Sequence, residues 1–155
     1  MMSLCCKVLQ ALAGKKLATA ESCTGGGIGA ALTAVPGSSS VYVGGVVSYT
    51  NDVKAGVLGV SRDLLDREGA VSAPVAQAMA KGVRELLHAD VAVSVTGLAG
   101  PGGDDHGNPV GTVFIGYCDE KCCISRECHF TGDREAVRTQ AIHAALNLIL
   151  CLDGV

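Results

Sequence analysis

Aromatic residues are scarce in this sequence, which contains no tryptophan, two phenylalanines and three tyrosines. A core of ordinary size must therefore be built from small aliphatic side chains, which let helices and strands approach closely, as in layered α/β folds. Long apolar runs are also lacking, because no segment reaches the roughly 18 uninterrupted apolar residues of a membrane-spanning helix. We therefore expect no membrane contact.

An excess of positive charge is lacking as well, since 12 Lys and Arg residues stand against 15 Asp and Glu residues, a net charge of -3. The basic residues are scattered, so the sequence lacks the electrostatic footprint that neutralises several nucleic-acid phosphates. A small, weakly charged ligand is a more suitable partner. The segment Met1–Lys7 has neither a basic leader nor the apolar run of a signal peptide, so we expect a cytoplasmic protein.

What is present is 48% hydrophobic residues, 21 glycines and eight cysteines in 155 residues. This length suits one domain, covering 1–155, with a sizeable core, and is too short for two domains of ordinary size. Disulfide frameworks belong to shorter, secreted chains with little core. We therefore expect reduced cysteines that act as small apolar residues.

Hydrophobic spacing and turn residues predict alternating helices and strands that end in a β-hairpin and a closing helix. This order indicates three layers, α/β/α, with a mixed, mostly parallel sheet of about five to six strands. Asn51, Ser61 and Ser72 are the expected N-caps of three helices. The expected helices are 4–12, 24–35, 51–58, 61–69, 72–88 and 133–151, and the expected strands are 16–20, 41–49, 90–96, 110–118 and 121–130.

Ser22 follows the first expected strand and precedes a glycine-rich helix start. At the carboxyl end of a buried strand, its hydroxyl and several free backbone N–H groups would point into one crevice. This arrangement suits a nucleophile beside an oxyanion or phosphate cradle. On these residues alone, simple helix capping by Ser22 or Thr24 is an equally good explanation.

A candidate base for Ser22 comes from Tyr49, which ends an expected strand, and Lys54, which falls in the first turn of the next helix. The helix dipole there disfavours a charged lysine by roughly 0.3–1 kcal/mol, so partial burial must supply most of any large fall in its pKa. A neutral lysine can act as a general base toward a serine, with a tyrosine hydroxyl relaying or holding the proton. The alternative is a solvated surface lysine and an ordinary strand aromatic.

The segment Gly97–Pro109 contains five glycines and must be a loop, and loops of this length usually carry function. Together with the Ser22 turn it would form one pocket at the ends of adjacent strands. Asp104 and Asp105 could bind a cation, but we expect them to be turn formers.

Two other patterns compete with this interpretation. Residues 25–30 match a dinucleotide-binding pattern, but the acidic residue expected about 20 positions later has only Asp52 as a candidate, and Asp52 follows a helix cap. The late hairpin offers potential zinc ligands, namely Cys118, Cys122, Cys123, Cys128 and His129. No C-x-x-C pair occurs and the spacing is that of a hairpin, so we expect no metal.

Cys23 is a rival nucleophile, because a helix N-terminus would favour its thiolate. No histidine lies near it in the sequence, so its base cannot be assigned. A cysteine hydrolase therefore remains an alternative.

Several separated motifs together closely resemble the C-terminal domain of the CinA family, the nicotinamide-nucleotide amidohydrolases. The likeness covers about residues 4–151 and is carried by Thr19–Gly26, Ser48-Tyr49 with Asn51 and Lys54, Gly97–Gly103, Pro109–Val113 and Arg134–Arg138. Many members carry an additional N-terminal domain, and this sequence looks like the stand-alone form.

The resemblance implies hydrolysis of the carboxamide of nicotinamide mononucleotide to nicotinic acid mononucleotide and ammonia, without metal or cofactor. Carried over by position, Ser22 would be the nucleophile, and Lys54 and Tyr49 its activating partners. The expected substrate-binding residues are Glu21, Cys23, Thr24, Gly25, Gly26, Asn51, Thr96, Gly97, Ala99, Gly100 and Arg138.

Rivals from other classes are a catalytically silent nucleotide-binding module of the same fold and a dinucleotide-dependent oxidoreductase. We also expect a homo-oligomer, because a small enzyme of this kind can readily pair through a helix face or a sheet edge.

Overall fold

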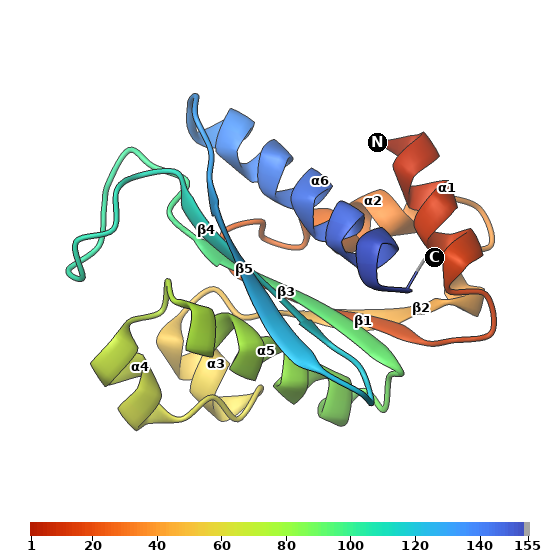
Figure 1. Ribbon diagram of the computed structural model, residues 1–155, viewed down its shortest axis with the longest axis horizontal. Helices are drawn as coiled ribbons and strands as arrows, with labels where there is room; N and C mark the ends of the chain where they lie inside the picture. The colour runs from red at the N-terminus through yellow and green to blue at the C-terminus, as the bar shows by residue number, and fades with distance from the viewer. Residues whose placement is uncertain (154–155) are drawn as a thin grey trace.

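A five-stranded mixed sheet forms the centre of this computed structural model, which describes residues 1–153 (Figure 1). The strand order is β2–β1–β3–β4–β5. β1 (Leu17–Glu21) pairs in parallel with β2 (Tyr42–Val47) and β3 (Val91–Gly97), whereas β4 (Thr112–Cys118) is antiparallel to β3 and to β5 (Cys123–His129). All strands except β4 therefore share one direction, which confirms the predicted mixed sheet.

Helices cover both faces of the sheet, so the predicted three-layer arrangement is also confirmed (Figure 1). One face carries α1 (Met2–Ala11), α2 (Gly27–Thr33) and α6 (Arg134–Asp153); the other carries α3 (Asn51–Gly56), α4 (Arg62–Glu68) and α5 (Ala73–Leu86). A short 3-10 helix, Ser38–Ser40, precedes β2. None of the helices described is both long enough and apolar enough to cross a membrane.

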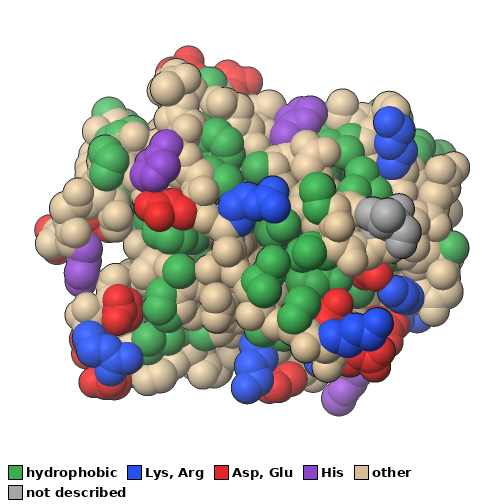
Figure 2. Space-filling view, viewed as in Figure 1, with side chains coloured by type: hydrophobic (Ala, Val, Ile, Leu, Met, Phe, Trp, Pro, Cys, Tyr) green, Lys and Arg blue, Asp and Glu red, His purple; other side chains and the backbone are tan. Residues whose placement is uncertain are grey.

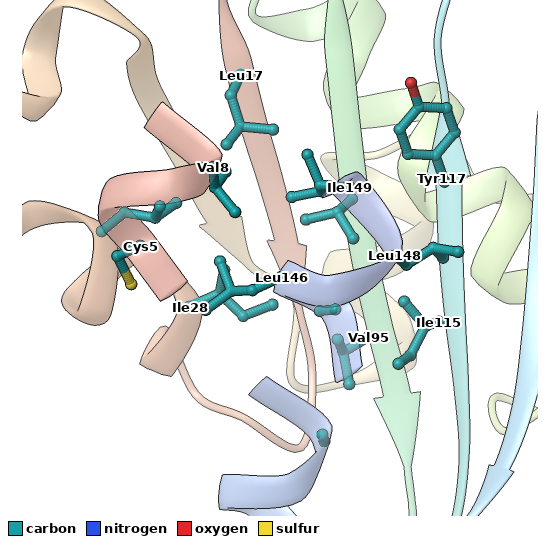
Figure 3. Packing of buried hydrophobic residues seen from close by; sticks show 14 of the residues in the cluster. Cys5, Val8, Leu17, Ile28, Val95, Ile115, Tyr117, Leu146, Leu148 and Ile149 are labelled. Atoms are coloured by element: carbon teal, nitrogen blue, oxygen red, sulfur yellow. The ribbon is translucent and has the colours of Figure 1, made fainter. Parts of the chain in front are cut away.

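The larger core lies between the sheet and the layer of α1, α2 and α6 (Figure 3). Leu17 and Val95 from the strands pack there with Val8 of α1 and Ile149 of α6, and all four side chains are fully buried. A smaller core under α5 includes Ala18, Ala20, Val75, Met79 and Val83. Small aliphatic side chains thus let the helices lie close to the sheet, as the scarcity of aromatic residues indicates.

Among the element boundaries that differ from the expected ones, two determine where the polar residues lie. The helix expected from residue 24 begins at Gly27, because Gly25 and Gly26 adopt positive φ angles of 59° and 97° and form a turn. β2 ends at Val47, so the segment Ser48–Thr50 lies beyond the sheet. Both turns are therefore free to carry a site at the end of the sheet.

The expected helix caps are correct in part. Thr50, and not Asn51, caps α3, because its hydroxyl accepts the Val53 N–H at 3.4 Å. Ser61 caps α4 as predicted. Ser72 occupies the N-cap position of α5, but its hydroxyl donates to the Gly69 carbonyl and makes no capping bond.

The expectation of reduced cysteines is wrong for one pair. Cys118 and Cys123 lie opposite each other in the β4–β5 ladder and form a disulfide. Hairpin pairing brings their Cα atoms within 4.2 Å, although the length of the chain gave no reason to expect a disulfide. The other six cysteines are free.

Figure 2 shows Lys and Arg side chains dispersed around the visible face and interspersed with acidic ones. Hydrophobic side chains gather near the middle of the same face. This face therefore has none of the broad basic surfaces that bind nucleic acids.

Candidate active site

The carboxyl ends of β1, β2 and β3 meet at one edge of the sheet. Ser22 directly follows β1, and its N–H donates to the Val95 carbonyl of β3 at 2.9 Å. Ser48 directly follows β2, and its N–H donates to the Glu21 carbonyl at 2.8 Å. Gly97 ends β3 and opens the glycine-rich loop. The topology thus brings three loops to one place, where α/β proteins usually bind their ligands.

Lys54 and Ser22 are in direct contact at this edge. The Lys54 Nζ lies 3.0 Å from the Ser22 Oγ, 2.8 Å from the Ser48 carbonyl oxygen and 3.5 Å from the Tyr49 carbonyl oxygen. The Lys54 side chain comes from α3, and Thr50 fixes the start of this helix. Lys54 and Ser22 are only 1% and 8% exposed. The structure therefore makes a buried serine–lysine pair from residues 32 positions apart.

Burial lowers the pKa of Lys54 from 10.5 to about 8, although the nearby Cys23 acts in the opposite direction. The partners of the amine are a hydroxyl and two carbonyls, and no carboxylate pairs with it in residues 1–153. Desolvation without a counter-charge is therefore the main cause, as the sequence argument required. A lysine with this pKa can accept a proton near neutral pH.

Cys23 lines the same pocket, but its surroundings disfavour the ionised form of its thiol. It is 7% exposed and packs into the larger core, and burial raises the pKa of its thiol to about 11, despite the opposing charges of Arg138 and Lys54. The expectation of a thiolate at this position is therefore wrong, because the effect of burial on the thiol pKa exceeds the effects of the nearby charges. None of the histidines, all of which are described, lines the pocket that contains Cys23.

Tyr49 lies at the rim of the site and is 58% exposed. Its hydroxyl accepts a hydrogen bond from Arg134 Nη2 at 3.2 Å, and Arg134 Nη1 donates to the Gly100 carbonyl at 2.9 Å. Within residues 1–153 no hydrogen bond joins the Tyr49 hydroxyl to Ser22 or Lys54. Tyr49 contacts the lysine through its main-chain carbonyl, and its side chain links Arg134 to the pocket wall.

These groups surround one cavity of about 470 Å³, which is large enough for a mononucleotide. Nine of the predicted site residues line it: Ser22, Cys23, Tyr49, Asn51, Lys54, Thr96, Gly97, Ala99 and Gly100. The remaining wall consists of Ala70, Val71, Leu98, Pro101, Gly102, Gly103 and Arg134.

The family model described as the CinA C-terminal domain matches residues 2–152 of the chain. The chain belongs to the CinA family. A CinA-like protein from Geobacter metallireducens is 52% identical over 126 residues, which are 81% of this chain and 30% of that protein. One from Synechococcus is 49% identical over 152 residues, 95% of this chain and 36% of that protein. The chain thus spans about a third of the length of these curated relatives.

Solved structures of CinA proteins share the whole fold. The CinA superfamily protein from Klebsiella pneumoniae is 38% identical with a TM-score of 0.93, covering 96% of this chain and 94% of that one. The competence/damage inducible protein CihA from Agrobacterium tumefaciens is 37% identical, also with a TM-score of 0.93, covering 97% and 94%.

The other predicted binding residues of this CinA domain are not among those that line the cavity. They are Glu21, Thr24, Gly25, Gly26 and Arg138. Arg138 donates from Nε to the Cys23 carbonyl at 3.0 Å and from Nη2 to the Thr24 carbonyl at 3.2 Å. Arg138 therefore holds the turn that carries Ser22, and its contact with a substrate stays a prediction.

Sequence reasoning assigned the pocket arginine to Arg138 and did not single out Arg134, which lines the cavity of this CinA domain. A usable signal was present. Arg134 is the first residue of α6, where the helix dipole disfavours a cation. The same dipole effect was expected at Lys54, but α3 ends at Gly56, so Lys54 lies in the last turn of that helix and burial alone lowers its pKa. Ala70 and Val71 carry no chemical signal, and only the fold brings them to the wall.

Asp104 confirms the expected turn-forming role. One of its oxygens accepts the N–H groups of His106 and Asn108, both at 3.1 Å, and the other accepts the Asn108 side-chain amide at 2.8 Å. In the described part of the chain, no group of three or more His, Cys, Asp and Glu side chains is arranged to hold a metal ion.

Ser48 provides a first test of the site's polar groups. Its hydroxyl is buried and has no hydrogen-bond partner in residues 1–153, whereas its carbonyl accepts from Lys54. Because an unpaired buried hydroxyl contributes no net stabilisation, Ser48→Ala is expected to keep the free energy of unfolding within about 0.5 kcal/mol of the original value or raise it. Urea denaturation checks this. A loss of about 2 kcal/mol or more would show that the hydroxyl has a partner.

Proposed function

We propose that this domain hydrolyses the carboxamide of nicotinamide mononucleotide to nicotinic acid mononucleotide and ammonia, with Ser22 as nucleophile. The observation that carries the proposal is the 3.0 Å contact between the Ser22 Oγ and a buried lysine whose pKa is about 8. Such a pair activates a hydroxyl for acyl transfer. The substrate is the one implied by the family resemblance, and the cavity volume is compatible with it.

In the first half of the reaction, neutral Lys54 accepts the Ser22 proton while the Oγ attacks the carboxamide carbon. The resulting ammonium then donates a proton to the departing nitrogen, so ammonia leaves and an acyl-serine remains. In the second half, Lys54 takes a proton from water, hydroxide attacks the ester, and the proton returns to the Ser22 Oγ. The carboxylic acid that forms loses its proton to solvent, which leaves the carboxylate and the original pair.

The developing oxyanion needs N–H donors that are not already engaged. The Gly25 N–H donates to the Ser22 carbonyl at 3.0 Å. The Cys23 and Thr24 N–H groups donate to no other residue in the described part of the chain. Of these two residues only Cys23 lines the cavity, so we assign the oxyanion contact to its amide. Arg134 and the loop from Thr96 to Gly103 supply positive charge and backbone N–H groups for the ribose phosphate.

The pH dependence of the reaction follows from the pKa of Lys54. Because the neutral amine is the base, kcat/KM is expected to rise about tenfold per pH unit below a pKa of about 8 and to level off above it. A pH series of ammonia release checks this. A profile that falls between neutral and mildly alkaline pH would mean that the charged lysine is required instead.

The decisive experiment for the reaction is ammonia release from nicotinamide mononucleotide, compared with nicotinamide riboside and free nicotinamide. We expect turnover of the mononucleotide and much weaker turnover of the compounds that lack the phosphate. Calorimetry that detects mononucleotide binding while no amide yields ammonia would contradict the hydrolase and favour the silent binding module.

A further inference from the structure

Glu21, the last residue of β1, immediately precedes Ser22 and is 2% exposed. Its Oε1 accepts from the Thr24 hydroxyl at 2.8 Å and from the Ile28 N–H at 2.7 Å. Its Oε2 accepts from the Gly29 N–H at 3.1 Å and, more weakly, from the Thr19 hydroxyl at 3.4 Å. Burial of a carboxylate is costly unless donors satisfy it, and this one has four.

The same carboxylate occupies the amides at the start of α2. The Ile28 and Gly29 N–H groups are the ones that a phosphate would use at this helix start, and Glu21 already accepts from both. The start of α2 therefore serves the nucleophile turn and not a substrate phosphate. We assign the substrate phosphate to another part of the cavity, which Arg134 lines.

The turn that carries Ser22 contains two glycines, Gly25 and Gly26, that both adopt positive φ angles. It is held from two sides. Glu21 ties it to β1 and α2 through Thr24, and Arg138 of α6 binds the carbonyls of Cys23 and Thr24. These contacts fix the backbone on both sides of the Ser22 Oγ.

We propose that Glu21 is a positioning residue, whose carboxylate holds the turn so that the Ser22 Oγ stays within reach of Lys54. This inference rests on the proposed role of Ser22 as nucleophile. Glu21→Gln keeps the shape of the side chain, but its NH2 group faces the Ile28 N–H or the Gly29 N–H, depending on which oxygen it replaces. The turn would then shift, and displacements of this kind cost far more in rate than in binding.

The test compares Glu21→Gln with Thr24→Val, a milder isosteric change that removes one contact of the same carboxylate. Ser94→Ala is the matched control, because it loses a buried 2.5 Å hydrogen bond to the Ala76 carbonyl, away from the pocket. Each variant is assayed well below its melting temperature. The readouts are kcat and KM for ammonia release and the rate at which a fluorophosphonate labels Ser22, because labelling does not depend on the natural substrate.

We expect Glu21→Gln to lower kcat and the labelling rate by about tenfold or more, with KM within about twofold, and Thr24→Val to lower both rates less. Ser94→Ala is expected to melt earlier but to be labelled at the original rate. Normal labelling of folded Glu21→Gln and Thr24→Val would overturn the inference and leave Glu21 as a helix cap only. If the unaltered protein is labelled but releases no ammonia, the proposed reaction fails, and the labelling rates still decide the role of Glu21.

Discussion

Replacement of Ser22 by alanine is expected to lower ammonia release from nicotinamide mononucleotide by about a thousandfold or more while the domain stays folded. The loss is large because the covalent route disappears with the Oγ. The structural cost is small, since Lys54 is the one side chain of residues 1–153 that hydrogen-bonds to the hydroxyl. Ammonia release and thermal melting of the same samples measure the two effects.

Cys23→Ala is the matched control, because Cys23 is the neighbouring candidate nucleophile. Burial raises the pKa of its thiol to about 11, so almost no thiolate exists near neutral pH. We expect Cys23→Ala to retain activity within about tenfold, with some loss of stability from the small cavity that it creates. An inactive Cys23→Ala together with an active Ser22→Ala would reverse the assignment and make the protein a cysteine hydrolase.

The fold could be predicted largely from the sequence because each strand carries a local signal. The apolar runs at β1 and β3 are buried on both faces of the sheet, and glycine or proline marks most of the connections between elements. Errors occurred where tertiary contacts decide. The start of α2 depends on the Gly25–Gly26 turn, and the disulfide between Cys118 and Cys123 depends on the register of a hairpin.

The site could be predicted in its chemistry but not in its geometry. Ser22 was found from its residue type and position, a hydroxyl at a strand end, and Lys54 from its place just after a predicted helix start. The helix α3 is shorter than expected, so Lys54 lies in its last turn. The direction in which a side chain points has no comparable signal in the sequence. Glu21 and Arg138 were expected to contact the substrate. The structure shows that both bind the turn that carries Ser22, and their contact with a substrate stays a prediction. Sequence proximity to Ser22 and accessibility to a substrate are different properties.

Lys54→Met is expected to abolish activity and, at mildly acidic pH, to make the domain more stable. Burial of the charged amine lowers its pKa from 10.5 to about 8. At a pH below both values this shift corresponds to a cost of about 3 kcal/mol. Methionine removes that cost but leaves the Ser48 carbonyl without its donor, a loss of about 1–2 kcal/mol. The net gain is about 1–2 kcal/mol at about pH 6.5.

The sign of this gain must change with pH, which makes the prediction specific. Between about pH 8 and 10.5 the unfolded chain binds a proton at Lys54 that the folded domain has released, so the stability of the original protein rises with pH. By about pH 9.5 it has regained about 2 kcal/mol, and the advantage of methionine has disappeared.

Urea denaturation of both proteins at the two pH values measures the difference in their stability, in which the effects of other titrating groups cancel. An equal stability difference at both pH values would mean that Lys54 is not buried as a charge, and the argument for a neutral base would lose its foundation. A crossover would show that the domain sacrifices stability at Lys54 to keep a base beside Ser22.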